Sequence, residues 1–154
     1  MQPGDRAPDF RLLDPSGETV QLSSLRGAPV VVFFYPKDDT PTCTAEACLF
    51  RDRYEEFVEA GARVIGISSD GAASHAAWAT KHRLPFTLLS DPDGKARKAF
   101  QVKRTLGILP GRSTFVLDGD GVVRHAFHSA RHPDRHVNDA LRVVKQLAAG
   151  AHRA

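Results

Sequence analysis

An uninterrupted apolar run from Val30 to Tyr35 limits the possible folds of this chain more than any other feature. The run consists of β-branched and aromatic residues, and a run without polar alternation is typical of a central strand of a parallel sheet, buried on both faces. Similar strand patterns occur at residues 63–68 and 85–89, and helical patterns precede each of them at residues 44–58 and 72–82. Strands that alternate with helices predict an α/β fold with a parallel sheet.

Two predicted β-hairpins extend this arrangement into a central mixed sheet flanked by helices. In both hairpins, turn residues such as Asp, Gly and Pro separate two short strands. Right-handed crossovers place helices on both faces of such a sheet, and ligands collect at the carboxyl ends of its parallel strands, where the loop from Pro36 to Thr42 lies. The predicted elements are an N-terminal hairpin with strands 10–13 and 19–22, a short helix at 95–102, a second hairpin with strands 113–117 and 122–127, and a closing helix at 134–149.

Composition and charge narrow the class of protein. The chain has 154 residues, of which 42% are hydrophobic, and this predicts one domain over residues 1–154 without a structural metal. The formal charge of +3 comes from scattered basic residues accompanied by acidic ones, which argues against a nucleic-acid-binding surface. No apolar run has the length of a membrane span, and the N-terminus lacks the pattern of a signal peptide. We therefore expect a soluble cytoplasmic protein.

The thiol of Cys43 is the side chain best suited to chemistry in this chain. The chain contains two cysteines, too few for a disulfide framework, and this favours a reducing compartment and a functional use of the thiols. Cys43 follows the strand that ends at Tyr35 and lies in or next to the first turn of the following helix. A helix N-terminus presents free N–H groups and a positive dipole end, which favour the reactive thiolate. The alternative is a small buried hydrophobic residue.

The second cysteine, Cys48, follows five residues later, so the pair does not form the C-x-x-C motif of dithiol oxidoreductases. Helix geometry separates their Cα atoms by about 8.6 Å and turns them about 140° apart around the axis. A disulfide requires a Cα separation below about 7 Å. The two sulfurs therefore bond only if the first helical turns unwind. Alternatively, Cys48 is a packing residue.

Three further residues are positioned to act with Cys43. Thr40 carries a hydroxyl that can donate to and accept from a small polar ligand beside the sulfur, or it serves as a turn or N-cap residue. Pro36 ends the strand and can also shield the sulfur from water. Arg112 leads into the strand at 113–117, where its guanidinium can stabilise a thiolate and hold a polar oxygen. Taken alone, Arg112 would be interpreted as a solvated surface residue.

Together, these residues resemble the active site of the peroxiredoxin family. Pro36, Thr40 and Cys43 have the spacing of its pattern P-x-x-x-T-x-x-C, which is specific when it lies at a strand-to-helix junction. The segment Phe34–Thr44 is similar to the peroxiredoxin Q branch, also called bacterioferritin comigratory protein, and the likeness covers roughly residues 3–148. Further matching segments are Ala47–Asp52, Leu84–Gly94 and Arg112–Phe115.

The resemblance implies a thioredoxin-like fold with the N-terminal β-hairpin as an extension. It implies a thiol-dependent peroxidase in which Cys43 is the peroxidatic cysteine, with Pro36, Thr40 and Arg112 completing the pocket. It also implies that Cys48 is the resolving cysteine and forms an intramolecular disulfide with Cys43. The implied substrates are hydrogen peroxide and organic hydroperoxides, and the implied reductant is of the thioredoxin or glutaredoxin type. No metal, haem or flavin is required, and a monomer is expected.

Three alternatives remain open at this point. A one-cysteine peroxidase would use Cys43 alone, with Cys48 as a packing residue. A noncatalytic thioredoxin-like binding module would have a Cys43 of ordinary reactivity. The third is a metal site, because His128, His132 and His136 are spaced by four as on a helical ligand face, although a proline after the second of them interrupts that face. We expect these histidines to lie scattered on the surface, and no site is indicated by the others, His75, His82, His125 and His152.

Overall fold

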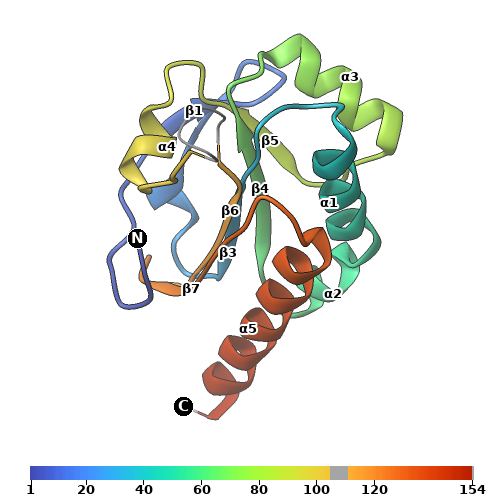
Figure 1. The fold of residues 1–154 in the computed structure, drawn as a ribbon. Helices are drawn as coiled ribbons and strands as arrows, with labels where there is room; N and C mark the ends of the chain where they lie inside the picture. The colour runs from blue at the N-terminus through green and yellow to red at the C-terminus, as the bar shows by residue number, and fades with distance from the viewer. Residues whose placement is uncertain (105–110, 154) are drawn as a thin grey trace.

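Seven strands form one mixed sheet at the centre of the fold, with α-helices on both faces (Figure 1). The computed structural model describes residues 1–104 and 111–153. The strands are β1 (Arg11–Leu13), β2 (Thr19–Gln21), β3 (Val30–Phe34), β4 (Arg63–Ser68), β5 (Thr87–Ser90), β6 (Ser113–Leu117) and β7 (Val123–His128). The helices are the 3-10 helix η1 (Leu22–Leu25) and the α-helices α1 (Pro41–Asp52), α2 (Tyr54–Glu59), α3 (Ala72–His82), α4 (Lys95–Ala99) and α5 (Pro133–Arg153).

The strand order β2-β1-β5-β4-β3-β6-β7 confirms the mixed sheet predicted from the sequence. The three central strands β5, β4 and β3 are parallel, and the two hairpins add antiparallel strands at both edges. The N-terminal hairpin joins β5 through the pair Leu13–Ser90, so the extension continues the main sheet. On the other side, β6 pairs with β3 and Phe34 lies opposite Ser113. This register brings Arg112 to the carboxyl end of β3.

The side chains of β3 alternate between two hydrophobic cores, as expected for a strand that is buried on both faces. Val31 and Phe33 pack with residues of α1, α2, α3 and α5, whereas Val32 and Phe34 pack with residues of α4 and the N-terminal segment. In Figure 1, α4 accordingly lies on the opposite side of the sheet from α1 and α3. Helices cover both faces, as the right-handed crossovers predict.

Close packing beneath Phe33 requires a glycine in the neighbouring strand. Gly66 of β4 lies opposite Phe33 in the register. A Cβ atom at Gly66 would lie 2.7 Å from Phe33 Cζ and 2.9 Å from Leu88 Cδ2, closer than real Cβ contacts. The absence of a side chain at Gly66 therefore leaves room for the Phe33 ring in the core.

One predicted helix is two helices in the structure. The sequence pattern predicts a continuous helix from residue 44 to residue 58, whereas α1 and α2 are separated at Arg53, which has φ −102° and ψ 5°. The Arg53 guanidinium donates to Glu56 in α2 and to Asn138 in α5. The contact with α5 joins distant parts of the chain, so local periodicity does not encode it, and the prediction of a continuous helix was wrong here.

The other boundaries differ from the prediction by a few residues. β5 begins at Thr87 rather than at residue 85, and α4 ends at Ala99 rather than at residue 102. Gly61 follows the end of α2. It adopts φ +80°, and Ala62 N donates back to Phe57 O, which is a helix end that favours glycine. Among residues 1–104 and 111–153, no helix combines the length and the hydropathy that a membrane span requires.

Candidate active site

The loop from Pro36 to Thr40 connects the carboxyl end of β3 with α1 and determines where that helix begins. Pro41 occupies the first helical position, where its missing N–H removes no helical hydrogen bond. Cys43 consequently lies in the first turn of α1, whose backbone N–H groups have no partner within the helix. The residue is 2% exposed, so its thiol is almost completely shielded from water.

Arg112, which directly precedes β6, contacts Cys43. Arg112 Nη2 donates to Cys43 Sγ at 3.1 Å. The guanidinium is buried, so water screens this contact little, and Arg112 is not a solvated surface residue. A positive donor at this distance stabilises a thiolate more than a thiol, because only the thiolate carries the opposite charge.

Glu46 binds the same guanidinium from α1. Its Oε1 accepts a hydrogen bond from Arg112 Nη1 at 3.2 Å, and the residue is 0% exposed. Burial raises the pKa of Glu46 to about 7, although the nearby charge of Arg112 opposes this rise. Within the described residues, Glu46 Oε2 and Arg112 Nε are buried without a hydrogen-bond partner. The carboxyl group therefore gains or loses a proton near neutral pH, about one helical turn after Cys43.

His136 of α5 completes this buried polar cluster, and the expectation that it lies on the surface was wrong. Its Nδ1 lies 3.7 Å from Glu46 Oε2 and accepts from Thr114 Oγ1 at 2.7 Å, while its Nε2 donates to Ser129 O at 2.9 Å. Burial lowers the pKa of His136 to about 4, which agrees with this pattern of a neutral ring. His136 therefore has partners other than a metal ion.

The three histidines that suggested a metal site differ in their exposure. His128 and His132 are exposed, whereas His136 is buried. Across residues 1–104 and 111–153, no three His, Cys, Asp or Glu side chains form a group that could hold a metal ion.

The two other predicted pocket residues lie on the loop before α1. Thr40 is half-buried and directly precedes the helix, but its hydroxyl donates to Lys37 O at 2.8 Å instead of capping the helix. Pro36 is also half-buried and follows directly after β3 and Tyr35. Both residues therefore belong to the short segment that leads to Cys43.

Arg97, which the sequence analysis did not single out, ties two parts of the site together. Its Nη2 donates to the carbonyl of Tyr35 at 3.0 Å, and its Nη1 donates to the carbonyl of Gly111 at 2.7 Å. The first carbonyl precedes Pro36 and the second precedes Arg112. Arg97 thus fixes the loop before α1 relative to the start of β6.

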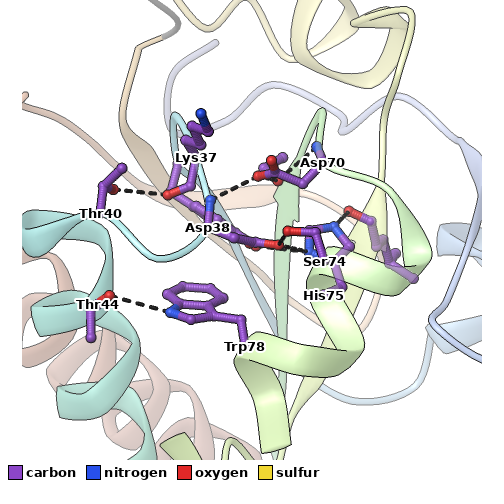
Figure 2. Close-up of polar contacts among 11 residues, drawn as sticks. Lys37, Asp38, Thr40, Thr44, Asp70, Ser74, His75 and Trp78 are labelled. Atoms are coloured by element: carbon purple, nitrogen blue, oxygen red, sulfur yellow. Dashed lines mark hydrogen bonds and ion pairs between the residues drawn. The ribbon is translucent and has the colours of Figure 1, made fainter. Parts of the chain in front are cut away.

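A second buried network, also missed from the sequence, holds the loop from the side of α3 (Figure 2). Asp38 is buried and points toward Ser74 and His75 of α3. It accepts hydrogen bonds from the Tyr35 hydroxyl at 2.6 Å and from Ser74 Oγ at 2.8 Å, and His75 Nδ1 lies 2.7 Å from it. His75 is fully buried as well, so it has a specific structural environment that its sequence position did not indicate.

Cys48 lies on a different side of α1 from Cys43. The helix is continuous from Pro41 to Asp52, both thiols are free, and Cys48 is half-buried whereas Cys43 is buried. In a continuous helix their Cα atoms are about 8.6 Å apart, which exceeds the limit of about 7 Å for a disulfide. In this structure, α1 is therefore fully helical and the two cysteines are not bonded to each other.

Comparison with known proteins identifies relatives over nearly the whole chain. The profile of the AhpC/TSA family matches residues 3–126. Peroxiredoxin Q, chloroplastic, of Triticum aestivum is 52% identical over 145 residues, which cover 94% of this chain and 67% of that protein. The protein of the same name from Sedum lineare is 50% identical over 145 residues, which cover 94% of this chain and 78% of that protein.

Solved structures agree with these relatives and confirm the predicted thioredoxin-like fold. Peroxidoxin BcpB from Mycobacterium tuberculosis superposes with a TM-score of 0.88 at 42% identity, covering 96% of this chain and 98% of that chain. Peroxiredoxin Q from Xanthomonas campestris superposes with a TM-score of 0.84 at 32% identity, covering 90% of this chain and 91% of that chain. The similarity therefore includes both the sheet and the helices that carry the site.

Proposed function

This chain belongs to the AhpC/TSA family and is a thiol-dependent peroxidase of the peroxiredoxin Q group, and we propose that Cys43 is the cysteine that attacks the peroxide. The observation that carries the proposal is the contact of 3.1 Å between Arg112 Nη2 and Cys43 Sγ. A buried positive donor beside sulfur favours the thiolate, which is the nucleophilic form. The position of Cys43 in the first turn of α1 supports the same assignment.

In the first proposed step, the Cys43 thiolate attacks the terminal oxygen of a hydroperoxide. The O–O bond breaks, Cys43 becomes a sulfenic acid, and the leaving alkoxide or hydroxide takes up a proton. Arg112 and Thr40 stabilise the negative charge that moves to the leaving oxygen. For this role the Thr40 hydroxyl turns away from the Lys37 carbonyl by rotation about its Cα–Cβ bond. Pro36 shields the reacting sulfur from water.

In the second proposed step, the Cys48 thiol condenses with the Cys43 sulfenic acid to give an intramolecular disulfide and water. Because the wound helix separates the two cysteines by more than a disulfide allows, the first turns of α1 must unwind before the bond forms. A thioredoxin-type or glutaredoxin-type dithiol then exchanges with the disulfide, restores both thiols and is itself oxidised. The cycle needs no metal, haem or flavin.

The proposal includes the substrates, the location and the assembly of the protein. The substrates are hydrogen peroxide and organic hydroperoxides, and the protein acts as a monomer in the cytoplasm. Two free thiols in a chain without a disulfide framework support a reducing compartment, while the plant relatives named above are chloroplastic proteins. The molar mass of the reduced protein, measured by light scattering, tests whether the protein is a monomer.

Replacing each cysteine by serine tests the assignment of the two thiols. Cys43→Ser should abolish peroxide consumption. Cys48→Ser should still undergo one oxidation at Cys43 but lose turnover with thioredoxin. Mass spectrometry of the wild-type chain after one equivalent of peroxide should find a Cys43–Cys48 disulfide. Full turnover by Cys43→Ser would show that the site is assigned wrongly.

The same experiment decides between the proposed cycle and a one-cysteine peroxidase. A Cys48→Ser variant that turns over with thioredoxin like the wild type would favour the one-cysteine mechanism, in which Cys48 only packs against its neighbours. The noncatalytic binding module considered from the sequence is contradicted by membership of a peroxidase family.

A further inference from the structure

One face of α3 contacts the segment from Asp38 to Thr44, which leads through the loop into the first turn of α1 (Figure 2). Near the C-terminal end of α3, Lys81 Nζ donates to Asp39 Oδ1 at 3.1 Å. In the middle of this face, Trp78 Nε1 donates to Thr44 Oγ1 at 3.2 Å, directly beside Cys43 in the chain. The contacting residues of α3 are three or four positions apart, so they lie on the same side of the helix. The helix α3 therefore contacts the segment that leads to Cys43 both in the loop and in the first turn of α1.

Toward the N-terminal end of this face, Asp38 and His75 form a buried pair. His75 Nδ1 lies 2.7 Å from Asp38 Oδ2, and His75 Nε2 lies 3.1 Å from Leu89 O, so both ring nitrogens face acceptor atoms. When each ring nitrogen carries a proton, His75 donates to both acceptors at once and forms an ion pair with the Asp38 carboxylate. Burial raises the pKa of Tyr35 well above its ordinary value, so its hydroxyl stays a donor to Asp38.

The contacts of α3 differ in strength because they differ in burial. The side chains of Lys81 and Asp39 are 60% and 61% exposed, and exposed ion pairs contribute little. The Asp38–His75 pair is almost completely buried, so removal of His75 would leave an uncompensated charge on Asp38 inside the protein. Asp38 then either takes up a proton, which weakens the hydrogen bonds that it accepts, or becomes exposed to water, which requires the loop to leave α3.

We propose that His75 is a positioning residue that holds the segment from Pro36 to Thr44 in the form that reacts with peroxide, and that it thereby opposes the unwinding that brings Cys43 to Cys48. This inference rests on the proposed function, because it assumes that Cys43 alternates between the wound helix and a disulfide. Stabilising the wound form speeds the attack on peroxide and slows disulfide formation. Loss of the His75 contact should therefore change the two rates in opposite directions.

Stopped-flow fluorescence of a His75→Phe variant tests the proposal. Trp78 is the one tryptophan of the chain and contacts Thr44, so its fluorescence reports on the start of α1. In the variant, the second-order rate constant for reaction with hydrogen peroxide should fall about tenfold, and the first-order rate constant for disulfide formation should rise about tenfold, because a stranded buried charge destabilises the wound form. Acid quenching, alkylation and mass spectrometry identify the species in each phase.

Two matched variants separate the ion pair from general damage to the protein. Lys81→Met removes the exposed contact of the same helix face, and both rate constants should stay within about twofold of the wild type. Adding Asp38→Asn to His75→Phe removes the unpaired carboxylate. The second-order rate constant for reaction with hydrogen peroxide should then recover at least partly. If His75→Phe does not fold, as judged by circular dichroism, Ser74→Ala removes one donor to Asp38 and should shift the two rates in the same opposite directions, by about threefold.

The outcomes distinguish failure of this proposal from failure of the proposed function. If both rates fall together in a folded His75→Phe variant, or if neither rate changes, His75 does not position the segment, whereas the proposed peroxidase cycle is unaffected. If the wild-type chain forms no Cys43–Cys48 disulfide after reaction with peroxide, the proposed cycle itself is wrong.

Discussion

The acidity of Glu46 predicts how the stability of the folded protein depends on pH. Burial raises the pKa of Glu46 from 4.5 to about 7, so between these two pH values the folded protein holds a proton that the unfolded chain has released. The free energy of unfolding therefore falls as pH rises through this window. Since one pKa unit corresponds to about 1.4 kcal/mol, Glu46 alone lowers the free energy of unfolding by about 3 kcal/mol across it.

His136 has the opposite effect in almost the same window. Burial lowers its pKa from 6.5 to about 4, so the folded protein lacks a proton that the unfolded chain holds, and the free energy of unfolding rises with pH there. The contributions of Glu46 and His136 largely offset each other in the wild-type protein. A comparison with a Glu46→Gln variant is therefore needed, because it removes one titration and keeps the other.

Urea unfolding of the reduced wild type and of Glu46→Gln between pH 4.5 and pH 8 measures this contribution. The free energy of unfolding of the wild type, minus that of the variant, should fall by about 3 kcal/mol over this range. As a control, Glu59→Gln removes an exposed carboxylate from α2 and changes the net charge equally. The free energy of unfolding of the wild type, minus that of Glu59→Gln, should stay constant within about 0.5 kcal/mol over the same pH range. If the difference between the wild type and Glu46→Gln stays constant with pH, burial does not raise the pKa of Glu46. If the difference increases with pH, the charge of Arg112 lowers this pKa more than burial raises it.

Three further substitutions test the site and the core. Arg112→Met removes the donor to Cys43 Sγ, and the second-order rate constant for peroxide, measured by stopped flow, should fall by about 10²–10³-fold; an unchanged rate would remove Arg112 from the site. Thr42→Gly weakens the first turn of α1 because glycine has a lower helix propensity, so disulfide formation should accelerate about twofold; no acceleration would mean that this turn does not limit the step. Gly66→Ala places a Cβ atom against Phe33 and should lower the free energy of unfolding by about 1–3 kcal/mol in urea; an unchanged unfolding midpoint would contradict the packing argument.

Local patterns in the sequence were enough to predict the elements that carry Cys43. The uniform apolar run of β3 indicated a strand buried on both faces, and its residues are buried in the structure. Pro41 and Gly61 marked the beginning of α1 and the end of α2, because proline suits a first helical position and glycine suits a left-handed helix end. These features depend on neighbouring residues only, so a single sequence contains them.

The partners of Cys43 were harder to predict because they come from distant parts of the chain. Glu46 and Arg112 are 66 residues apart, and Asp38 and His75 are 37 residues apart. Each of these charged residues would be assigned to the surface by composition alone, and only the folded sheet and helices bring it to its buried partner. For Glu46 one local signal was available, since a residue three positions after Cys43 lies on the same side of the helix.

Glu46 lies between Cys43 and Cys48 in the chain. A rearrangement of α1 that joins the two sulfurs therefore also withdraws the intervening carboxyl from Arg112 and transfers it to water. There its acidity returns to that of an ordinary glutamic acid, and it releases the proton that the reduced protein retains near neutral pH. In the proposed cycle, the balance between dithiol and disulfide thus depends on the protonation of a third side chain, and acidic surroundings favour the dithiol.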